Sequence, residues 1–119
     1  MRGDAMKVQY LEIVTSDVDA VCAVYAQIHG AEFGDSDMSL GGARTATLSD
    51  GGLIGVRGPL REGEDPAVRS YVLVEDIQAA VDAAAKSGAM VALPPMELGT
   101  HGTCAIVIQG GIECGFWQV

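Results

Sequence analysis

The spacing of hydrophobic and polar residues changes twice along the chain, each time at an aspartate. Strand-like runs begin at Tyr10 and at Arg69, and each reaches an aspartate after a few residues. Apolar residues then recur every three or four positions, as on one face of an α-helix, until a glycine ends the pattern. The expected helices lie between Asp17 and Gly30 and between Asp76 and Gly88, with Ser16 or Asp17 capping the first and Asp76 the second.

A second pattern follows each helix and is also repeated. The stretch "GARTATLSDGGLIGVR" from Gly42 matches "GTCAIVIQGGIECGFW" from Gly102. Each predicts two strands joined by a two-residue turn, Asp50-Gly51 in the first and Gly110-Gly111 in the second. The segments "FGDSD" and "VALPP" supply a short strand before each hairpin. The order strand, helix and three strands therefore occurs twice, which predicts an α+β fold of two tandem βαβββ modules.

The chain of 119 residues is expected to form a single domain. Module 1 spans about 7–57, a polar linker with two prolines spans 58–67, and module 2 spans about 68–119. Neither module is large enough to bury much apolar surface alone, so the two should pack together.

Composition excludes several classes of partner. The net charge is −9, from 16 acidic and 7 basic residues, which argues against binding to nucleic acid or to an anionic membrane. No apolar run approaches the ~20 residues that cross a bilayer, and "MRGDAMKVQY" lacks a secretory signal. Three cysteines, an odd number, indicate reduced thiols. We therefore expect a cytoplasmic protein.

The repeated pattern resembles the vicinal oxygen chelate superfamily, which includes glyoxalase I, bleomycin-resistance proteins, fosfomycin-resistance enzymes and extradiol dioxygenases. Its best-matched motifs are "EIVTSDVDAVCAVYAQIHGAEF" and "GTCAIVIQGGIECGFWQ". The resemblance implies paired modules forming a curled sheet around an open cavity. It also implies a homodimer, which exposed edge strands would favour as well.

Metal-dependent members of this superfamily carry ligands at four positions, to which Tyr10, Gly55, Arg69 and Gly115 correspond. Glycine and arginine offer no suitable ligand, and one tyrosine is a weak one. We therefore expect no metal and no cofactor. The two glycines either leave room in the cavity for a larger ligand or relieve strain where a strand bends.

Strand alternation predicts which side chains face the cavity. A two-residue turn pairs Cys104 with Trp117 in the last hairpin, and the same assumption pairs Arg44 with Arg57 in the first. The expected ligand-binding residues are Tyr10, Glu12, Arg44, Arg57, Arg69, Tyr71, Cys104, Glu113 and Trp117.

Three of these residues are arginines, which bind carboxylates and phosphates through two hydrogen bonds. This favours a ligand with an aromatic or apolar body and an anionic group. The alternative is that the arginines lie at a solvated rim. If Glu12 and Glu113 both pair with arginines, the cavity becomes nearly neutral and the preference disappears.

Three functions remain open. The first is metal-free binding of a small organic molecule in the cavity between modules. The second is a metal-independent lyase or isomerase that uses Glu12 or Tyr71 as acid or base. The third is an oligomeric module whose cavity has no ligand. The sequence does not decide whether the protein is an enzyme.

Overall fold

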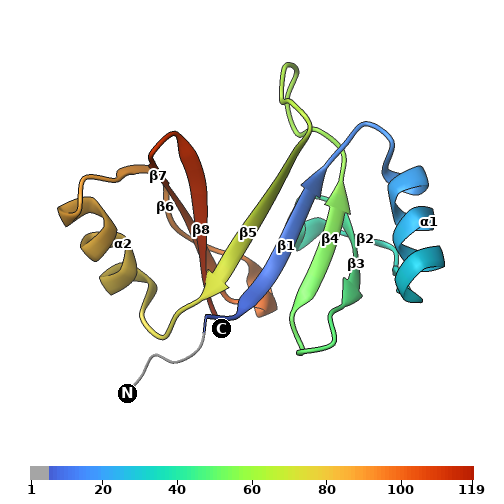
Figure 1. Ribbon diagram of the computed structural model, residues 1–119, viewed down its shortest axis with the longest axis horizontal. Coiled ribbons are helices and arrows are strands. Elements are labelled where there is room, and N and C mark those ends of the chain that lie inside the picture. Colours follow the sequence, from blue (N-terminus) through green and yellow to red (C-terminus); the bar gives the residue numbers. More distant parts are fainter. Residues whose placement is uncertain (1–5) are drawn as a thin grey trace. The chain divides into compact units, whose positions relative to one another are not determined.

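The computed structural model describes residues 6–119, which divide into two compact units. The first unit comprises Tyr10–Val68, and the second comprises 69–119 together with the residues before Tyr10. Each unit contains one helix and four strands (Figure 1). Neither helix in the described part of the chain has the length and apolar character needed to cross a membrane.

The first unit is a four-stranded sheet with one helix. Its strands lie in the order β2-β3-β4-β1, with β1 parallel to β4 and the other pairs antiparallel. Its elements are β1 (Val8–Val14), α1 (Val18–His29), β2 (Ser36–Asp37), a 3₁₀ turn (Met38–Leu40), β3 (Ala43–Thr47) and β4 (Leu53–Arg57).

The second unit repeats this arrangement in the order β5-β8-β7-β6, with β5 parallel to β8. Its elements are β5 (Ala67–Leu73), α2 (Ile77–Lys86), β6 (Met90–Glu97), a 3₁₀ turn (Gly99–His101), β7 (Thr103–Gln109) and β8 (Ile112–Gln118). The predicted α+β class with two βαβββ modules is therefore confirmed.

The helix ends follow the sequence signals with one exception. Asp76 accepts a hydrogen bond from the Ala79 N–H at 3.0 Å, and α1 ends at Gly30 with a φ of 70°. The side chain of Asp17 makes no such capping bond, so that part of the prediction is wrong. The N–H of Asp17 instead donates to Oγ1 of Thr15 at 3.0 Å.

Each helix covers one face of its own sheet with apolar side chains, and the opposite face of the sheet is here called the helix-free face. In the first unit the buried cluster between α1 and the sheet consists of Cys22 from the helix and of Ile13, Ala46, Ile54 and Val56 from the strands. In the second unit the buried cluster consists of Ile77, Val81 and Ala105, with Val74 and Phe116 packed against it. Side chains of alternate residues along each strand point to the helix-free face.

The predicted register of the last hairpin is confirmed. Cys104 lies opposite Trp117, and Ile106 lies opposite Gly115. The turn residues Gly110-Gly111 both have positive φ, 62° and 77°, as a two-residue turn of this hand requires.

The first hairpin differs because its loop is one residue longer. The Leu48 N–H donates to the Gly52 carbonyl at 2.7 Å, which leaves residues 49–51 as a three-residue loop. The last of these, Gly51, has a φ of 92°. This is the usual three-residue hairpin with a left-handed final residue.

The longer loop moves Arg44 to the other face of the sheet. Arg44 lies opposite Val56 rather than Arg57, so the predicted pairing is wrong. Its Nη1 lies 3.1 Å from Oδ1 of Asp19 in α1, and its Nε donates to the Gly34 carbonyl at 3.0 Å. Arg44 is therefore on the helix side and does not belong with the other predicted ligand-binding residues.

Candidate functional site

The helix-free face of the first unit brings together residues from two parallel strands. Glu12 on β1 lies beside Gly55 on β4, and the next pair along is Val14 with Arg57. Tyr10 is one step back on β1 and points to the same face. Tyr10, Glu12 and Arg57 are all buried, with 3%, 8% and 5% of their surface exposed.

Arg57 is held by two carboxylates. Its Nε donates to Oε2 of Glu12 at 2.8 Å. Its Nη1 and Nη2 donate to Oε1 and Oε2 of Glu64 at 3.1 and 2.9 Å, a bidentate arrangement. The one guanidinium therefore faces two negative charges, and the group of three carries a net charge of about −1 when all are ionised.

Glu64 comes from the segment predicted as a linker and was not among the expected site residues. Its Oε1 also accepts a hydrogen bond from the Leu60 N–H at 2.7 Å. The hydrogen bonds from Arg57 and Leu60 lower the pKa of Glu64 to about 2. Burial works against the charge of Arg57, but its hydrogen bonds to Glu64 and Glu12 outweigh that effect and raise the pKa of Arg57.

The ring of Tyr10 lies over Gly55. A Cβ at position 55 would be 2.5 Å from Cζ of Tyr10 and would overlap the hydroxyl oxygen. Burial raises the pKa of the Tyr10 phenol, and the nearby carboxylates of Glu12 and Asp37 raise it further against the opposing effect of Arg57. Burial is thus the main reason that the phenol stays protonated, with the carboxylate of Glu12 as the next contribution.

The helix-free face of the second unit holds a smaller ion pair. Nε and Nη2 of Arg69 lie 2.8 and 2.6 Å from Oε1 of Glu113. The Arg69 side chain is 12% exposed and that of Glu113 is 47% exposed. This pair is closer to solvent than the Arg57 group, and its two charges balance.

A second tyrosine covers the second glycine. A Cβ at Gly115 would be 2.5 Å from Cδ2 of Tyr71 and 2.8 Å from the Ser70 carbonyl oxygen. Tyr71 also meets Trp117 edge to face, with ring centroids 5.6 Å apart and an interplanar angle of 78°. The Trp117 Nε1–H donates to the His101 carbonyl at 3.0 Å, which fixes the indole orientation.

Cys104 lies opposite Trp117 on β7 and is buried, whereas Cys114 is exposed. All three thiols are free, as expected from the odd number of cysteines. Burial raises the pKa of Cys22, which lies on the buried side of α1.

The two glycines do not leave open space. In each unit a tyrosine ring fills the volume next to the glycine, so the interpretation that the missing side chains make room for a larger ligand is wrong. Neither glycine has a positive φ, so neither is required for a left-handed backbone conformation. A tyrosine ring approaches each glycine closely, and at Gly115 the Ser70 carbonyl oxygen does so too.

The residues at the four family positions do not fit a metal ion. Two are glycines under tyrosine rings, and Arg69 is a cation paired with Glu113. Across residues 6–119, no cluster of three or more His, Cys, Asp and Glu side chains is arranged to hold one. The donor set that zinc or a similar ion requires is missing from this face.

The preference for an anionic ligand was expected to disappear if Glu12 and Glu113 both paired with arginines, and both do. Glu12 pairs with Arg57, and Glu113 pairs with Arg69. Glu64 adds a further negative charge at Arg57. The arginine charges are therefore neutralised within the protein, and in the first unit they are exceeded.

Comparison with known proteins gives the following relatives. No protein-family model matches the chain. Two curated proteins, both named "Putative glyoxylase CFP32" and from Mycobacterium bovis and Mycobacterium tuberculosis, are 27% identical over 116 residues. The match covers 92% of this chain but 44% of each relative, so the chain spans less than half of their length.

Solved structures share the fold at lower identity. The hypothetical protein BH1468 from Bacillus halodurans has a TM-score of 0.76 with 14% identity, covering 98% of this chain and 96% of that one. A Streptomyces coelicolor methylmalonyl-CoA epimerase, solved with 2-nitronate-propionyl-CoA, has a TM-score of 0.69 with 19% identity, covering 97% and 98%. At these identities the likeness concerns the fold alone.

Proposed function

We propose that this chain, which shares its fold with the solved structures and resembles the curated relatives in sequence, is a metal-independent binding protein for a small organic cation. The ligand would carry an aromatic or apolar body and a positively charged group. The contacts would come from the helix-free face of the first unit, from Tyr10, Glu12, Arg57 and Glu64.

One observation carries this proposal: the single positive charge of Arg57 is paired with two carboxylates, which leaves one negative charge in excess. Glu12 and Glu64 hold its guanidinium at 2.8 and 2.9 Å, and all three side chains are largely buried. Buried charges are screened little by salt, so the excess negative charge acts strongly on a group brought next to it. Tyr10 adds an aromatic face to which a cation is also attracted.

Catalysis receives no such support. Glu12 accepts a hydrogen bond from the Arg57 Nε at 2.8 Å, so its carboxylate is already engaged within the protein. Tyr71 packs against Gly115 and Trp117. These contacts give no support to the alternative of a lyase or isomerase that uses Glu12 or Tyr71. A cytoplasmic location stays a prediction that rests on the sequence.

The test uses three probes that share a phenyl body and differ in charge: phenethylamine, phenethyl alcohol and phenylacetate. Isothermal titration in the presence of EDTA should show phenethylamine binding about tenfold or more tightly than phenylacetate, with the alcohol between them. Tighter binding of phenylacetate, or binding that requires a divalent metal, would contradict the proposal.

A matched pair of variants on one loop identifies the charge responsible. Glu64→Gln keeps the shape of the side chain but removes its charge, so phenethylamine affinity should fall about three- to tenfold. Glu62→Gln makes the same change at an exposed position and should leave the affinity unchanged. Equal effects of the two variants would mean that only the overall charge of the protein matters.

A further inference from the structure

The helices α1 and α2 occupy the same place in the two units, but their surfaces differ. When Asp17 is aligned with Asp76, five positions of α1 align with alanine or serine in the second unit. Four of these α1 residues are large and mainly apolar, and the fifth is alanine. The α1 residues are Ala20, Val21, Val24, Tyr25 and Ile28, and their α2 counterparts are Ala79, Ala80, Ala83, Ala84 and Ser87. The shared fold therefore does not require bulky apolar residues there, and α1 carries them for another reason.

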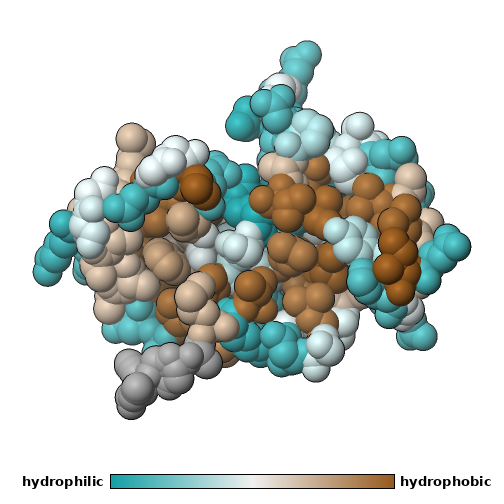
Figure 2. Space-filling view, in the orientation of Figure 1, coloured by the Kyte–Doolittle hydropathy of each residue, from teal (hydrophilic) through white to brown (hydrophobic). Residues whose placement is uncertain are grey.

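The large apolar side chains of α1 are exposed. Val24 is 53% exposed and Ile28 is 67% exposed. Together with Ala20, Val21 and Tyr25 they surround a shallow hollow of about 430 Å³. Figure 2 shows the brown, hydrophobic surface over α1 at the right of the view. Contiguous exposed apolar surface of this kind is typical of an interaction site.

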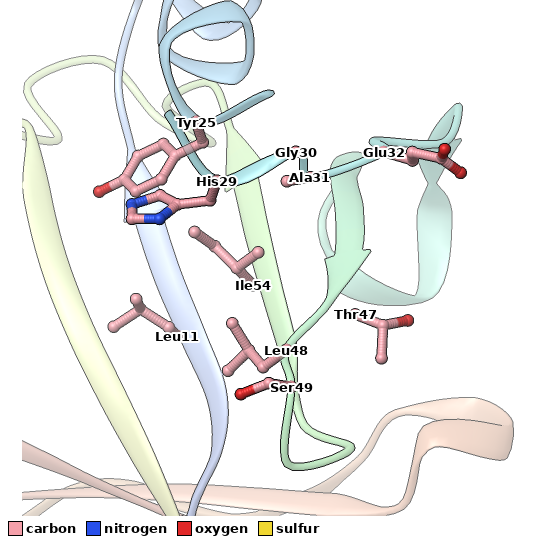
Figure 3. Close-up of a pocket in the computed structure, with 10 residues that line it drawn as sticks. All are labelled: Leu11, Tyr25, His29, Gly30, Ala31, Glu32, Thr47, Leu48, Ser49 and Ile54. Atoms are coloured by element: carbon pink, nitrogen blue, oxygen red, sulfur yellow. The ribbon is translucent and has the colours of Figure 1, made fainter. Parts of the chain in front are cut away.

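A second hollow shares Tyr25 with the first. It has a volume of about 760 Å³, and its floor is formed by Leu11, Leu48 and Ile54 (Figure 3). The rings of Tyr25 and His29 stack above this floor with centroids 5.9 Å apart and an interplanar angle of 26°. We call the two hollows together the α1 groove.

The first hollow is lined by uncharged side chains alone, those of Ala20, Val21, Val24, Tyr25 and Ile28. The second hollow is lined by Glu32 and His29 as well as by apolar residues. The first hollow is therefore an uncharged, apolar surface on a protein with a net charge of −9. Two copies of such an acidic chain repel each other except where they meet through a surface of this kind.

The exposed ridge of α1 is complementary to itself. Ala20, Val24 and Ile28 are each four residues apart, with Val24 at the centre. If two α1 helices meet antiparallel about a two-fold axis at Val24, Val24 faces its own copy and each Ile28 faces an Ala20 of the other chain. A large residue then meets a small one on both sides of the axis, as packing of i±4 ridges requires.

We propose that a second copy of this chain binds through α1, with Val24 at the two-fold axis and Ile28 entering the α1 groove of the other copy. The edge strands are a poorer route. β2 has only two residues, and β6 contains Pro94 and Pro95 with two breaks in its register. Both features are ways of preventing strand pairing between chains, so the expectation that edge strands drive dimerisation is not supported.

Sedimentation velocity of wild type, Val24→Glu and Ala83→Glu tests the interface. Wild type should be a dimer at tens of micromolar. Val24→Glu should raise the dissociation constant by about tenfold or more, because it places two carboxylates against each other at the axis. Ala83→Glu makes the same change at the matching exposed position of α2 and should leave the dimer intact.

A cross-link tests the axis itself. In a Cys114→Ser background, Val24→Cys should form a disulfide-linked dimer under mild oxidation, because a residue on a two-fold axis faces its own copy. Ala83→Cys in the same background should not. A linked Ala83→Cys dimer together with an unlinked Val24→Cys protein would overturn the proposed geometry.

Two other results of the sedimentation experiment would also contradict the proposal. A monomeric wild type would overturn the proposal and leave the α1 groove to a different protein or a small molecule. A dimer unaffected by Val24→Glu would place the interface elsewhere. Val24 lies on α1, and the proposed ligand-binding residues of the first unit lie on the helix-free face of its sheet. Titration of the Val24→Glu variant with phenethylamine therefore tests the proposed function independently of the interface.

Discussion

The Tyr10 ring lies where a side chain at Gly55 would have to begin. Tyr71 has the same relation to Gly115 in the second unit. The two glycines are equivalent in the repeat and correspond to positions that hold metal ligands in metal-dependent relatives. In each unit an aromatic ring therefore fills the space next to the glycine.

Gly55→Ala should therefore destabilise the protein by about 1–3 kcal/mol, the usual cost of forcing a group into a filled site. Tyr10→Ala removes the obstructing ring, so the double variant should recover most of the cost of the glycine substitution. Urea denaturation of the four proteins in this cycle measures the coupling free energy. Gly34→Ala is the control, because a Cβ there meets nothing within 4 Å. Additive effects would show that the ring does not define the site.

Gly115→Ala should behave differently in the matching cycle. Its Cβ would meet the Ser70 carbonyl oxygen at 2.8 Å as well as the Tyr71 ring. Since a backbone atom cannot be removed by mutation, Tyr71→Ala should recover little of the cost. Recovery as complete as in the first unit would mean that the Tyr71 ring alone restricts this position.

The two arginine pairs should differ in their importance for stability. Arg57→Ala strands two largely buried carboxylates and should cost about 3–5 kcal/mol, the range for breaking a buried ion pair. Arg69→Ala leaves Glu113, which is 47% exposed and can be hydrated, so the cost should be about 1 kcal/mol or less. Denaturant unfolding at neutral pH compares the two, and equal costs would contradict the burial argument.

The Arg57–Glu64 pair should also make stability depend on pH. Because the pKa of Glu64 falls from its ordinary 4.5 to about 2 on folding, its stabilising effect is complete above pH 4.5 and is lost as the pH falls towards 2. Wild type should be more stable than Glu64→Gln at neutral pH, with the difference shrinking across that window. Asp19→Asn, which removes an exposed pair with Arg44, is the control and should show a small difference throughout.

The fold was accessible from the sequence because each element carries a local signal. The aspartates and glycines that bound both helices, and the Gly110-Gly111 turn, fix their elements through backbone conformation. The first hairpin was misread because Asp50-Gly51 suits a two-residue turn, while the actual loop of 49–51 places its glycine in the last position of a three-residue one. That single residue moved Arg44 to the other face.

The site was less accessible, since its main contacts are not local. Glu64 lies in a polar segment without periodicity, and nothing in that segment shows that its carboxylate meets Arg57. The Tyr10–Gly55 contact joins two strands diagonally, which alternation along one strand does not reveal. The pairs of Glu12 with Arg57 and of Glu113 with Arg69 were considered in advance, and they neutralise the arginine charges on which the expected anionic ligand depended.

The metal content of the purified protein tests the central claim most directly. The protein should be expressed without an affinity tag in medium supplied with zinc, manganese, nickel and iron, and analysed by plasma mass spectrometry. Tyrosine rings over both glycines and an arginine paired with Glu113 predict far less than one divalent metal per chain, and an unfolding temperature unchanged by EDTA. One tightly held metal per chain, whose removal lowers that temperature, would contradict the account.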